Sequence, residues 1–231
     1  MRLFEDDGVV ALDKPSGISM ATAASDPASA ARVVATLLEA CGERPDATLR
    51  LVHRLDVGTS GVVLLARTDE AHRALSRLFQ SRAARKTYRA LVWGHPRPAR
   101  GTFDDPLARD PKDGRRMKAA GGGKPSITDY TTLARLPSVA DLELSPRTGR
   151  THQIRVHLSA HGHPIVGDDL YGGATRWHGV RHPGHRRALA DVKRPLLHAS
   201  RIEIAEMDLD VSASLPPDYV RMLETLSSSR A

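Results

Sequence analysis

The spacing of hydrophobic and polar residues along the chain predicts many short strands and only a few helices. In residues 69–82, apolar side chains recur every three or four positions while arginines and a histidine fill the other side, which is typical of an amphipathic helix. Further helices are expected over residues 27–41, from Thr151 as cap to Gly162 as stop, and from Pro217 onward. Strands are expected at residues 9–12, 51–54, 61–67, 85–94, 125–136, 140–146 and 196–205. Because strands outnumber helices and alternate with them irregularly, the pattern predicts an α+β fold with a mixed or antiparallel sheet, in a single domain over residues 1–231.

Two basic segments interrupt this pattern. Residues 109–124 combine several glycines with Arg115, Arg116 and Lys118, which predicts a mobile, positively charged loop. Residues 176–194 form a second basic stretch before the strand at 196–205. We expect both segments to contact phosphate groups, because lysine and arginine gain affinity by displacing counterions from nucleic acid.

Composition narrows the classes of protein. The 231 residues include 34 Lys and Arg against 27 Asp and Glu, a net charge of +7 that favours a polyanionic partner, although an ordinary basic protein has the same balance. The one cysteine, Cys41, excludes internal disulfides and multi-cysteine metal sites. Since no secretory signal or membrane span is recognisable, we expect a soluble, cytoplasmic protein.

Residues 51–61, LVHRLDVGTSG, place one carboxylate in a turn after an apolar segment. If this segment is extended, Arg54 and Asp56 project to the same face, and the guanidinium favours the ionised carboxylate. Such a carboxylate can act as a nucleophile or a base. A salt-bridged bend with no chemical role is the alternative, and the motif alone does not separate the two.

A second group of polar residues lies in residues 145–172. Here Thr151 is expected at the start of a helix with Arg155 one turn later, so the helix N-terminus and Arg155 can meet one anion. Arg150 and His152 adjoin this point, and we expect them to contact nucleic acid together with Thr151. On the expected strand at 85–94, Tyr88 lies on the opposite face from Thr87 and Arg89, and its ring can stack on a base. For a single tyrosine in a strand, however, a place in the core is the more frequent case.

Together, the segments DKPSG, HRLDVGTSG, KTYRALVWG, TGRTHQIRVHLSAHGHPIVGD and LLHA resemble, in this order, the motifs of the RluA-type RNA pseudouridine synthases. The resemblance covers roughly residues 8–206. It implies a long, mostly antiparallel sheet with flanking helices and a central catalytic cleft. It also implies isomerisation of selected uridines in tRNA or rRNA to pseudouridine, with no cofactor and no metal. The chain is expected to hold the catalytic core only, without the N-terminal RNA-binding domain of some relatives, and to act as a monomer with no obligatory protein partner.

The resemblance also implies roles for single residues. Asp56 corresponds to the family's essential aspartate, and Tyr88 to the tyrosine that stacks on the flipped uracil. Arg155 corresponds to the basic residue that forms a salt bridge with the aspartate, and Arg54 to the arginine that fills the gap left by the flipped base. The chain departs from many relatives at Val57 and Gly58, where charged residues are frequent.

Two other functions compete with this one. One is an RNA-binding protein of the same fold without activity, which the presence of Asp56, Tyr88 and Arg155 argues against. The other is a metal enzyme that uses histidines. The histidines form two groups, which are His157, His161 and His163, and His178, His182 and His185. We rank the metal enzyme low because both groups lie in basic surroundings and have no cysteines beside them.

Overall fold

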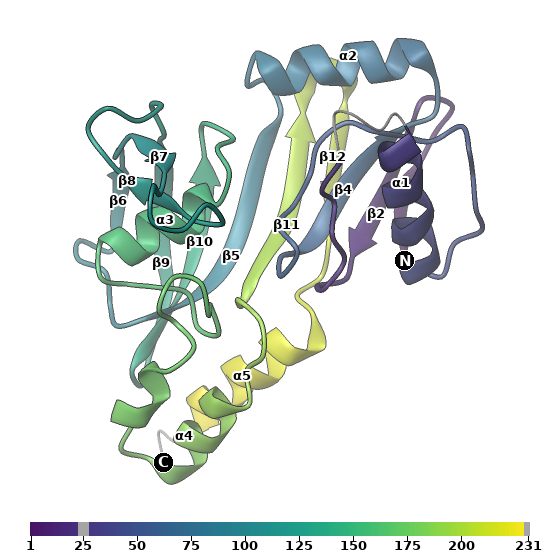
Figure 1. Ribbon diagram of the computed structural model, residues 1–231. Helices are drawn as coiled ribbons and strands as arrows, with labels where there is room; N and C mark the ends of the chain where they lie inside the picture. The colour runs from purple at the N-terminus through teal and green to yellow at the C-terminus, as the bar shows by residue number, and fades with distance from the viewer. Residues whose placement is uncertain (23–27, 229–231) are drawn as a thin grey trace. The chain divides into compact units, whose positions relative to one another are not determined.

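The computed structural model describes residues 1–22 and 28–228, and the chain divides into two compact units (Figure 1). Unit 1 comprises Met1–Lys86 and Ala199–Ser214, and unit 2 comprises Thr87–His198 and Leu215–Ala231. The chain passes between the units three times: inside the strands β5 (Arg85–Trp93) and β11 (Leu197–Ile204), and between Ser214 and Leu215. The single catalytic domain expected over residues 1–231 stays a prediction.

Unit 1 is a sheet with helices packed on it. The strand order is β1, β2, β4, β11, with β3 beside β4 and β12 beside β11. The elements of this unit not yet delimited are β1 (Arg2–Glu5), β2 (Val9–Lys14), α1 (Ala28–Ala40), β3 (Arg50–Leu51), β4 (Ser60–Ala66), α2 (Asp69–Gln80), the short 3-10 turn Ala205–Met207 and β12 (Leu209–Ser212). The expected helix 27–41 is therefore confirmed from Ala28, while residue 27 lies outside the described residues.

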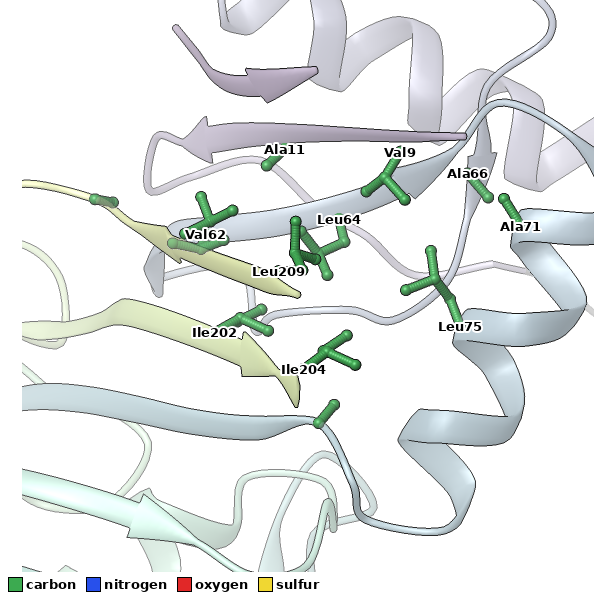
Figure 2. Packing of buried hydrophobic residues seen from close by; sticks show 13 residues of the cluster. Val9, Ala11, Val62, Leu64, Ala66, Ala71, Leu75, Ile202, Ile204 and Leu209 are labelled. Atoms are coloured by element: carbon green, nitrogen blue, oxygen red, sulfur yellow. The ribbon is translucent and has the colours of Figure 1, made fainter. Parts of the chain in front are cut away.

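The core of unit 1 forms where α2 covers one face of this sheet. Side chains alternate along a strand, so Val62 and Leu64 of β4 point to the same face as Ile202 of β11, and Leu75 of α2 packs against them (Figure 2). Helix α2 begins where Thr68 accepts a hydrogen bond from the backbone N–H of Ala71 at 3.1 Å. The amphipathic pattern at 69–82 thus predicted both the helix and its buried face.

Unit 2 contains a second set of antiparallel strands in the order β5, β10, β9, β6. The other elements of this unit are β6 (Arg100–Phe103), β7 (Leu107–Arg109), β8 (Met117–Ala119), β9 (Thr128–Leu136), β10 (Val139–Pro146), α3 (Gln153–Ala160), the 3-10 turn Arg176–Gly179, α4 (Pro183–Ala190) and α5 (Pro217–Ser227). The predicted hairpin of β9 and β10 is confirmed, with Leu136 opposite Val139. The α+β class is confirmed as well, whereas the central cleft stays a prediction.

Two expectations about local structure are wrong, and the second basic segment has a structure that the sequence did not predict. The basic segment 109–124 is not simply a loop, because it contains β8, which pairs with β7 as a small hairpin with Leu107 opposite Ala119. The second basic segment contains helix α4, which buries His185 and Leu189. The strand expected at 51–54 ends at Leu51, since residues 52–56 join no ladder.

Among the helices of residues 1–22 and 28–228, none combines the length and the apolar character needed to cross a bilayer.

Candidate active site

The loop that carries Asp56 lies in unit 1 and is held by a buried lysine. Lys14 ends β2, is fully buried, and donates from Nζ to the carbonyls of Thr59 at 2.8 Å, Pro15 at 3.0 Å and Val57 at 3.3 Å. A turn closes the loop, because Thr59 N–H bonds to the carbonyl of Asp56 at 3.0 Å. The ammonium group therefore fixes the backbone of the turn from Asp56 to Thr59, and the segment DKPSG serves to shape the segment HRLDVGTSG.

Two glycines allow this loop to pack closely. Gly17 donates its N–H to the carbonyl of Val57 at 2.7 Å and has a φ of +90°, a conformation that other residues adopt only with strain. Gly61 has a φ of +115°, and a side chain there would collide with the backbone of Ala199. Hence the glycine after the Asp56 turn is required both by its backbone angle and by its neighbour.

His53, at the start of the same motif, is a structural residue. Its Nε2 accepts the N–H of Leu64 at 2.9 Å, and its ring stacks on Phe79 with centroids 4.6 Å apart. Burial, with a smaller contribution from the ammonium of Lys86, lowers the pKa of His53 to about 3, so the ring stays neutral and can accept this bond. His53 thereby ties the segment before Asp56 to β4 and α2.

The central role of Lys14 gives a stability prediction. Replacing Lys14 with methionine keeps the length, leaves the carbonyls of Pro15 and Thr59 without this donor and removes one of the two donors to Val57. We therefore expect the free energy of unfolding to fall by roughly 2–4 kcal/mol. Urea unfolding measures this. Lys118→Met, on the exposed side of β8, is the matched control and should stay within about 0.5 kcal/mol of the parent protein. Equal unfolding midpoints for both variants and the parent would show that Lys14 does not hold the loop.

Arg54 is exposed and forms no ion pair with Asp56 within the described residues, so the local Arg54–Asp56 pair expected from the sequence is wrong. The reason lies in the backbone, since residues 52–56 are not held in a ladder that would keep the two side chains on one face. Leu55 between them is buried and its N–H contacts the sulfur of Met20 at 3.4 Å. The exposed guanidinium remains compatible with a contact to RNA, which stays a prediction.

Tyr88 lies on β5 in unit 2 and is half-buried. It stands opposite Leu144 of β10 and packs against an apolar cluster that includes Ile154 of α3. Arg89 points to the other face, where it forms an ion pair with Asp141. The predicted alternation along this strand is thus confirmed, and an aromatic ring supported by apolar side chains on one side is suited to stacking.

Helix α3 begins differently from the expected form. Its N-cap is His152, in the left-handed conformation with a φ of 56°, and its first residue is Gln153, so the prediction of Thr151 as cap is wrong. Thr151 is exposed and precedes the helix, and it therefore does not share a helical face with Arg155. The C-terminal end of α3 is as predicted, because Gly162 follows the helix with a φ of +83°.

Gln153 replaces a conventional cap and uses every hydrogen-bonding position of its amide. Its Oε1 accepts the hydroxyl of Thr148 at 2.7 Å and the N–H of Arg150 at 3.0 Å. Its Nε2 donates to the carbonyl of Ile127 and to Oγ1 of Thr128, both at 2.9 Å. This buried side chain fixes the TGR turn against β9, which sets the starting point of α3.

Arg155 is buried and forms a bidentate ion pair with Asp168, from Nε at 2.7 Å and from Nη2 at 2.8 Å. Asp168 is fully buried and also accepts the N–H of Tyr171 at 3.1 Å. A planar guanidinium that is hydrogen-bonded along one edge by a carboxylate has a fixed orientation. Neither Asp168 nor Tyr171 was predicted as a site residue, although both lie in the polar segment 145–172. The ion pair between Arg155 and Asp56 stays a prediction.

Three of the basic residues of the β7–β8 hairpin, Arg115, Arg116 and Lys118, differ in their surroundings. Arg115 is exposed and pairs with Asp113 at 2.9 Å, a surface ion pair of little energetic value. Hydrogen bonds from Arg115 lower the pKa of the Asp113 carboxyl to about 2. Lys118 is exposed on β8, and the guanidinium of Arg116 lies 5.5 Å from the ring centre of Tyr171. Arg150, in the turn before α3, reaches the carbonyl of Pro125 at 3.3 Å.

The histidines of the first group have protein partners. His157 is fully buried, with Nδ1 2.9 Å from Oγ1 of Thr128 and Nε2 3.0 Å from the carbonyl of Asp105. Nδ1 of His163 lies 2.9 Å from the carbonyl of Trp93. Within residues 1–22 and 28–228 no group of three or more His, Cys, Asp or Glu is arranged to hold a metal ion. These contacts assign His157 and His163 to the structure of unit 2.

The structure thus brings together some of the predicted site residues. Asp56 and Arg54 belong to unit 1, and the other predicted residues, Tyr88, Arg115, Arg116, Lys118, Arg150, Thr151, His152 and Arg155, belong to unit 2. Within unit 2, Arg116, His152 and Arg155 all lie around Tyr171. Lys14 and Gln153 are the other residues that the sequence analysis missed, and both occur in segments quoted there.

Comparison with known proteins identifies the family. The model of the family described as RNA pseudouridylate synthase matches residues 8–160, and the chain belongs to this family. It is 38% identical over 204 residues to the dual-specificity RNA pseudouridine synthase RluA of Escherichia coli K12, covering 87% of this chain and 85% of the relative. The RluA-type resemblance is therefore confirmed.

Other relatives are longer than this chain. The ribosomal large subunit pseudouridine synthase D of Xanthomonas campestris is 35% identical over 233 residues, which cover 99% of this chain and 70% of the relative. An uncharacterized RNA pseudouridine synthase of Chloroflexus aurantiacus is 41% identical over 180 residues, which span 76% of this chain and only 53% of that protein.

Solved structures agree on the fold. The human RNA pseudouridylate synthase domain containing 4 matches with a TM-score of 0.77 and 27% identity, over 98% of this chain and 92% of the human chain. The human RNA pseudouridylate synthase domain containing 1 matches with a TM-score of 0.73 and 25% identity, over 99% and 95%. The chain thus has a pseudouridine synthase fold.

Proposed function

We propose that this protein isomerises selected uridines in structured RNA, either tRNA or rRNA, to pseudouridine, and that Asp56 is its essential carboxylate. The observation that carries the proposal is the position of Asp56 in a loop held by Lys14, within the residues 8–160 that match the family. Tyr88 and Arg155 lie in the same matched range, and the family resemblance assigns all three to one reaction.

The reaction rearranges bonds without an external reactant. The bond between C1′ of the ribose and N1 of uracil breaks, the detached base rotates, and C1′ bonds to C5. The proton at C5 is lost and N1 gains one, so atoms and electrons balance without an oxidant or reductant. An ionised Asp56 contributes by adding to the sugar or the base, or by removing a sugar proton. This balance is consistent with the absence of a cofactor requirement that the resemblance implies.

The target uridine has to leave its stack before it reacts. Flipping a base out of an RNA stem costs a few kcal/mol. Stacking on Tyr88 and contacts between basic side chains and phosphates offset this cost, and Arg54 is proposed to fill the gap left in the stem. We further propose that the protein works in the cytoplasm as a monomer, with RNA as its partner.

Phosphate binding is assigned to the β7–β8 hairpin and to the exposed arginines of α4, Arg186 and Arg187. Arg194 is not proposed to bind phosphate, because it forms a bidentate ion pair with Asp218 at 2.7 and 2.8 Å. Phosphate contacts carry little sequence information, so the choice of uridine is proposed to come from the shape of the RNA and the bases around the target.

Neutralising Arg115, Arg116 and Lys118 together, as glutamine, should weaken binding to every RNA alike and reduce the salt slope of binding by about one unit per lost contact. The turnover at saturating RNA should hardly change. Titrations at several salt concentrations measure both the affinity and the slope.

The control for this variant replaces Arg2, Arg67 and Arg201 with glutamine. These three arginines belong to unit 1, outside the hairpin, and each pairs with a surface carboxylate, so the same loss of charge should leave the salt slope nearly unchanged. If the hairpin variant and the control change the slope equally, the hairpin is not a specific RNA contact.

The function itself is tested in cells. We expect deletion of the gene to remove pseudouridine at one or a few positions of tRNA or rRNA. The wild-type gene should restore these positions, and a gene encoding Asp56→Asn should not. An unchanged pseudouridine map in the deletion strain would contradict the proposed function.

A further inference from the structure

Tyr171 is a buried tyrosine that contacts residues from two other segments of unit 2, the β7–β8 hairpin and helix α3. Its hydroxyl oxygen accepts the backbone N–H of Met117 on β8 at 2.9 Å and lies 2.8 Å from Nδ1 of His152 at the start of α3. A hydroxyl that accepts one bond still has its own proton to donate, so both contacts can be made at once. The hydroxyl therefore links the hairpin to the helix.

The ring of Tyr171 adds two cationic contacts. The guanidinium carbon of Arg155 lies 5.0 Å from the ring centre, and that of Arg116 lies 5.5 Å from it. Both distances are within the range of cation–π attraction. The backbone N–H of Tyr171 also donates to Asp168, the partner of Arg155. One residue thus touches both Arg155 and the hairpin.

Apolar side chains around Tyr171 also connect the hairpin to α3. Leu107, Val156 and Tyr171 form a small buried cluster, and Met117 and Leu170 pack against it. The hairpin rests on α3 through this cluster, which is small enough that single hydrogen bonds matter to how firmly the hairpin is held. His152, which has a strained positive φ, gains a partner for its ring from Tyr171.

We propose that Tyr171 is a positioning residue that couples the RNA-binding β7–β8 hairpin to Arg155 and His152. Through the hydroxyl of Tyr171, the start of α3 holds the hairpin in the position in which it binds RNA, while the ring of Tyr171 keeps its contact with Arg155. This inference rests on the proposed function, because it assigns the hairpin to RNA and Arg155 to the reaction.

The test is Tyr171→Phe, which removes the hydroxyl and keeps the ring. In the free protein, the amide of Met117 loses its acceptor and should exchange with solvent about tenfold faster. The dissociation constant for RNA should rise about fivefold, as expected for the loss of one hydrogen bond that holds the hairpin. The rate of pseudouridine formation at saturating RNA should stay within about twofold, since the ring contact with Arg155 remains.

Tyr130→Phe is the matched control. Tyr130 is a buried tyrosine of the same unit whose hydroxyl donates to the carbonyl of Pro98 at 3.1 Å, away from the hairpin. Tyr130→Phe should leave the dissociation constant for RNA unchanged, whatever it does to the melting temperature. If Tyr171→Phe also lowers only the melting temperature and leaves the dissociation constant unchanged, Tyr171 serves stability alone.

A double-mutant cycle decides between coupling and independent effects. In a protein that already lacks the charges of Arg115, Arg116 and Lys118, Tyr171→Phe should no longer weaken RNA binding. An undiminished fivefold loss in that background, or unchanged exchange at Met117 in Tyr171→Phe, would overturn the proposal. Exchange and binding need no turnover, so a protein that makes no pseudouridine but shows both effects would overturn the proposed function and leave the coupling standing.

Discussion

Replacing Asp56 with asparagine is expected to abolish pseudouridine formation and to leave RNA binding almost unchanged. Asparagine has the same volume but no charge, and the loop around Asp56 is held through backbone carbonyls that bond to Lys14. The fold of the loop should therefore survive. Loss of an essential reacting group lowers turnover by about 10⁴-fold or more.

Single-turnover assays at saturating RNA, combined with binding titrations, measure this difference. Asp210→Asn is the control, since Asp210 is an exposed carboxylate of the same unit that pairs with Arg201. It should behave like the parent protein in both assays. A rate for Asp56→Asn within a few-fold of the parent protein would remove Asp56 from the mechanism.

The second large effect is expected at Arg155. Arg155→Ala leaves the fully buried Asp168 without its cation, and breaking a buried ion pair in this way costs about 3–5 kcal/mol of unfolding free energy. Turnover should fall as well, because the family resemblance places this arginine beside the essential aspartate. The single variant alone cannot separate the two causes.

The double variant Arg155→Met with Asp168→Leu separates them. Removing both charges restores much of the lost stability, because no buried charge is left unpaired. Turnover should stay at least about 100-fold below the parent protein if Arg155 takes part in the reaction. Chemical denaturation and single-turnover rates measure the two quantities on the same samples.

The chain offers a control pair with the same geometry. Arg194 and Asp218 also form a bidentate ion pair in unit 2, outside the quoted motifs. Arg194→Met with Asp218→Leu should keep wild-type turnover. Recovery of turnover together with stability in the Arg155 and Asp168 double variant would reduce Arg155 to a structural role.

Local patterns predicted much of the fold because they act over short stretches of sequence. The amphipathic spacing at 69–82 predicted α2, and the close succession of two strand patterns around Ser138 predicted the hairpin of β9 and β10. The hairpin of β7 and β8 was not predicted, because strands of three residues are too short to show an alternation of apolar and polar side chains. Gly162 ended its helix as predicted, because a left-handed residue after a helix is a local requirement.

Residues that act over long distances in the sequence were harder to predict. A lysine is seldom fully buried, so Lys14 was not expected to hold the Asp56 loop. Thr151 satisfied the rule for a helix cap, but Gln153 bonds to the turn before it and to β9, and the helix starts later. Tyr171 gains its contacts with Met117 and His152 only when segments far apart in the chain come together.

The central claim is tested most directly by following the hydrogen at C5 of uridine. Total RNA from cells that lack the gene, labelled with tritium at C5 of its uridines, is incubated with the purified protein. Because C5 forms the new bond to the ribose, the wild-type protein should release tritium to water in proportion to the pseudouridine formed, and Asp56→Asn should release none. No tritium release by the wild-type protein, or equal release by both proteins, would contradict the account.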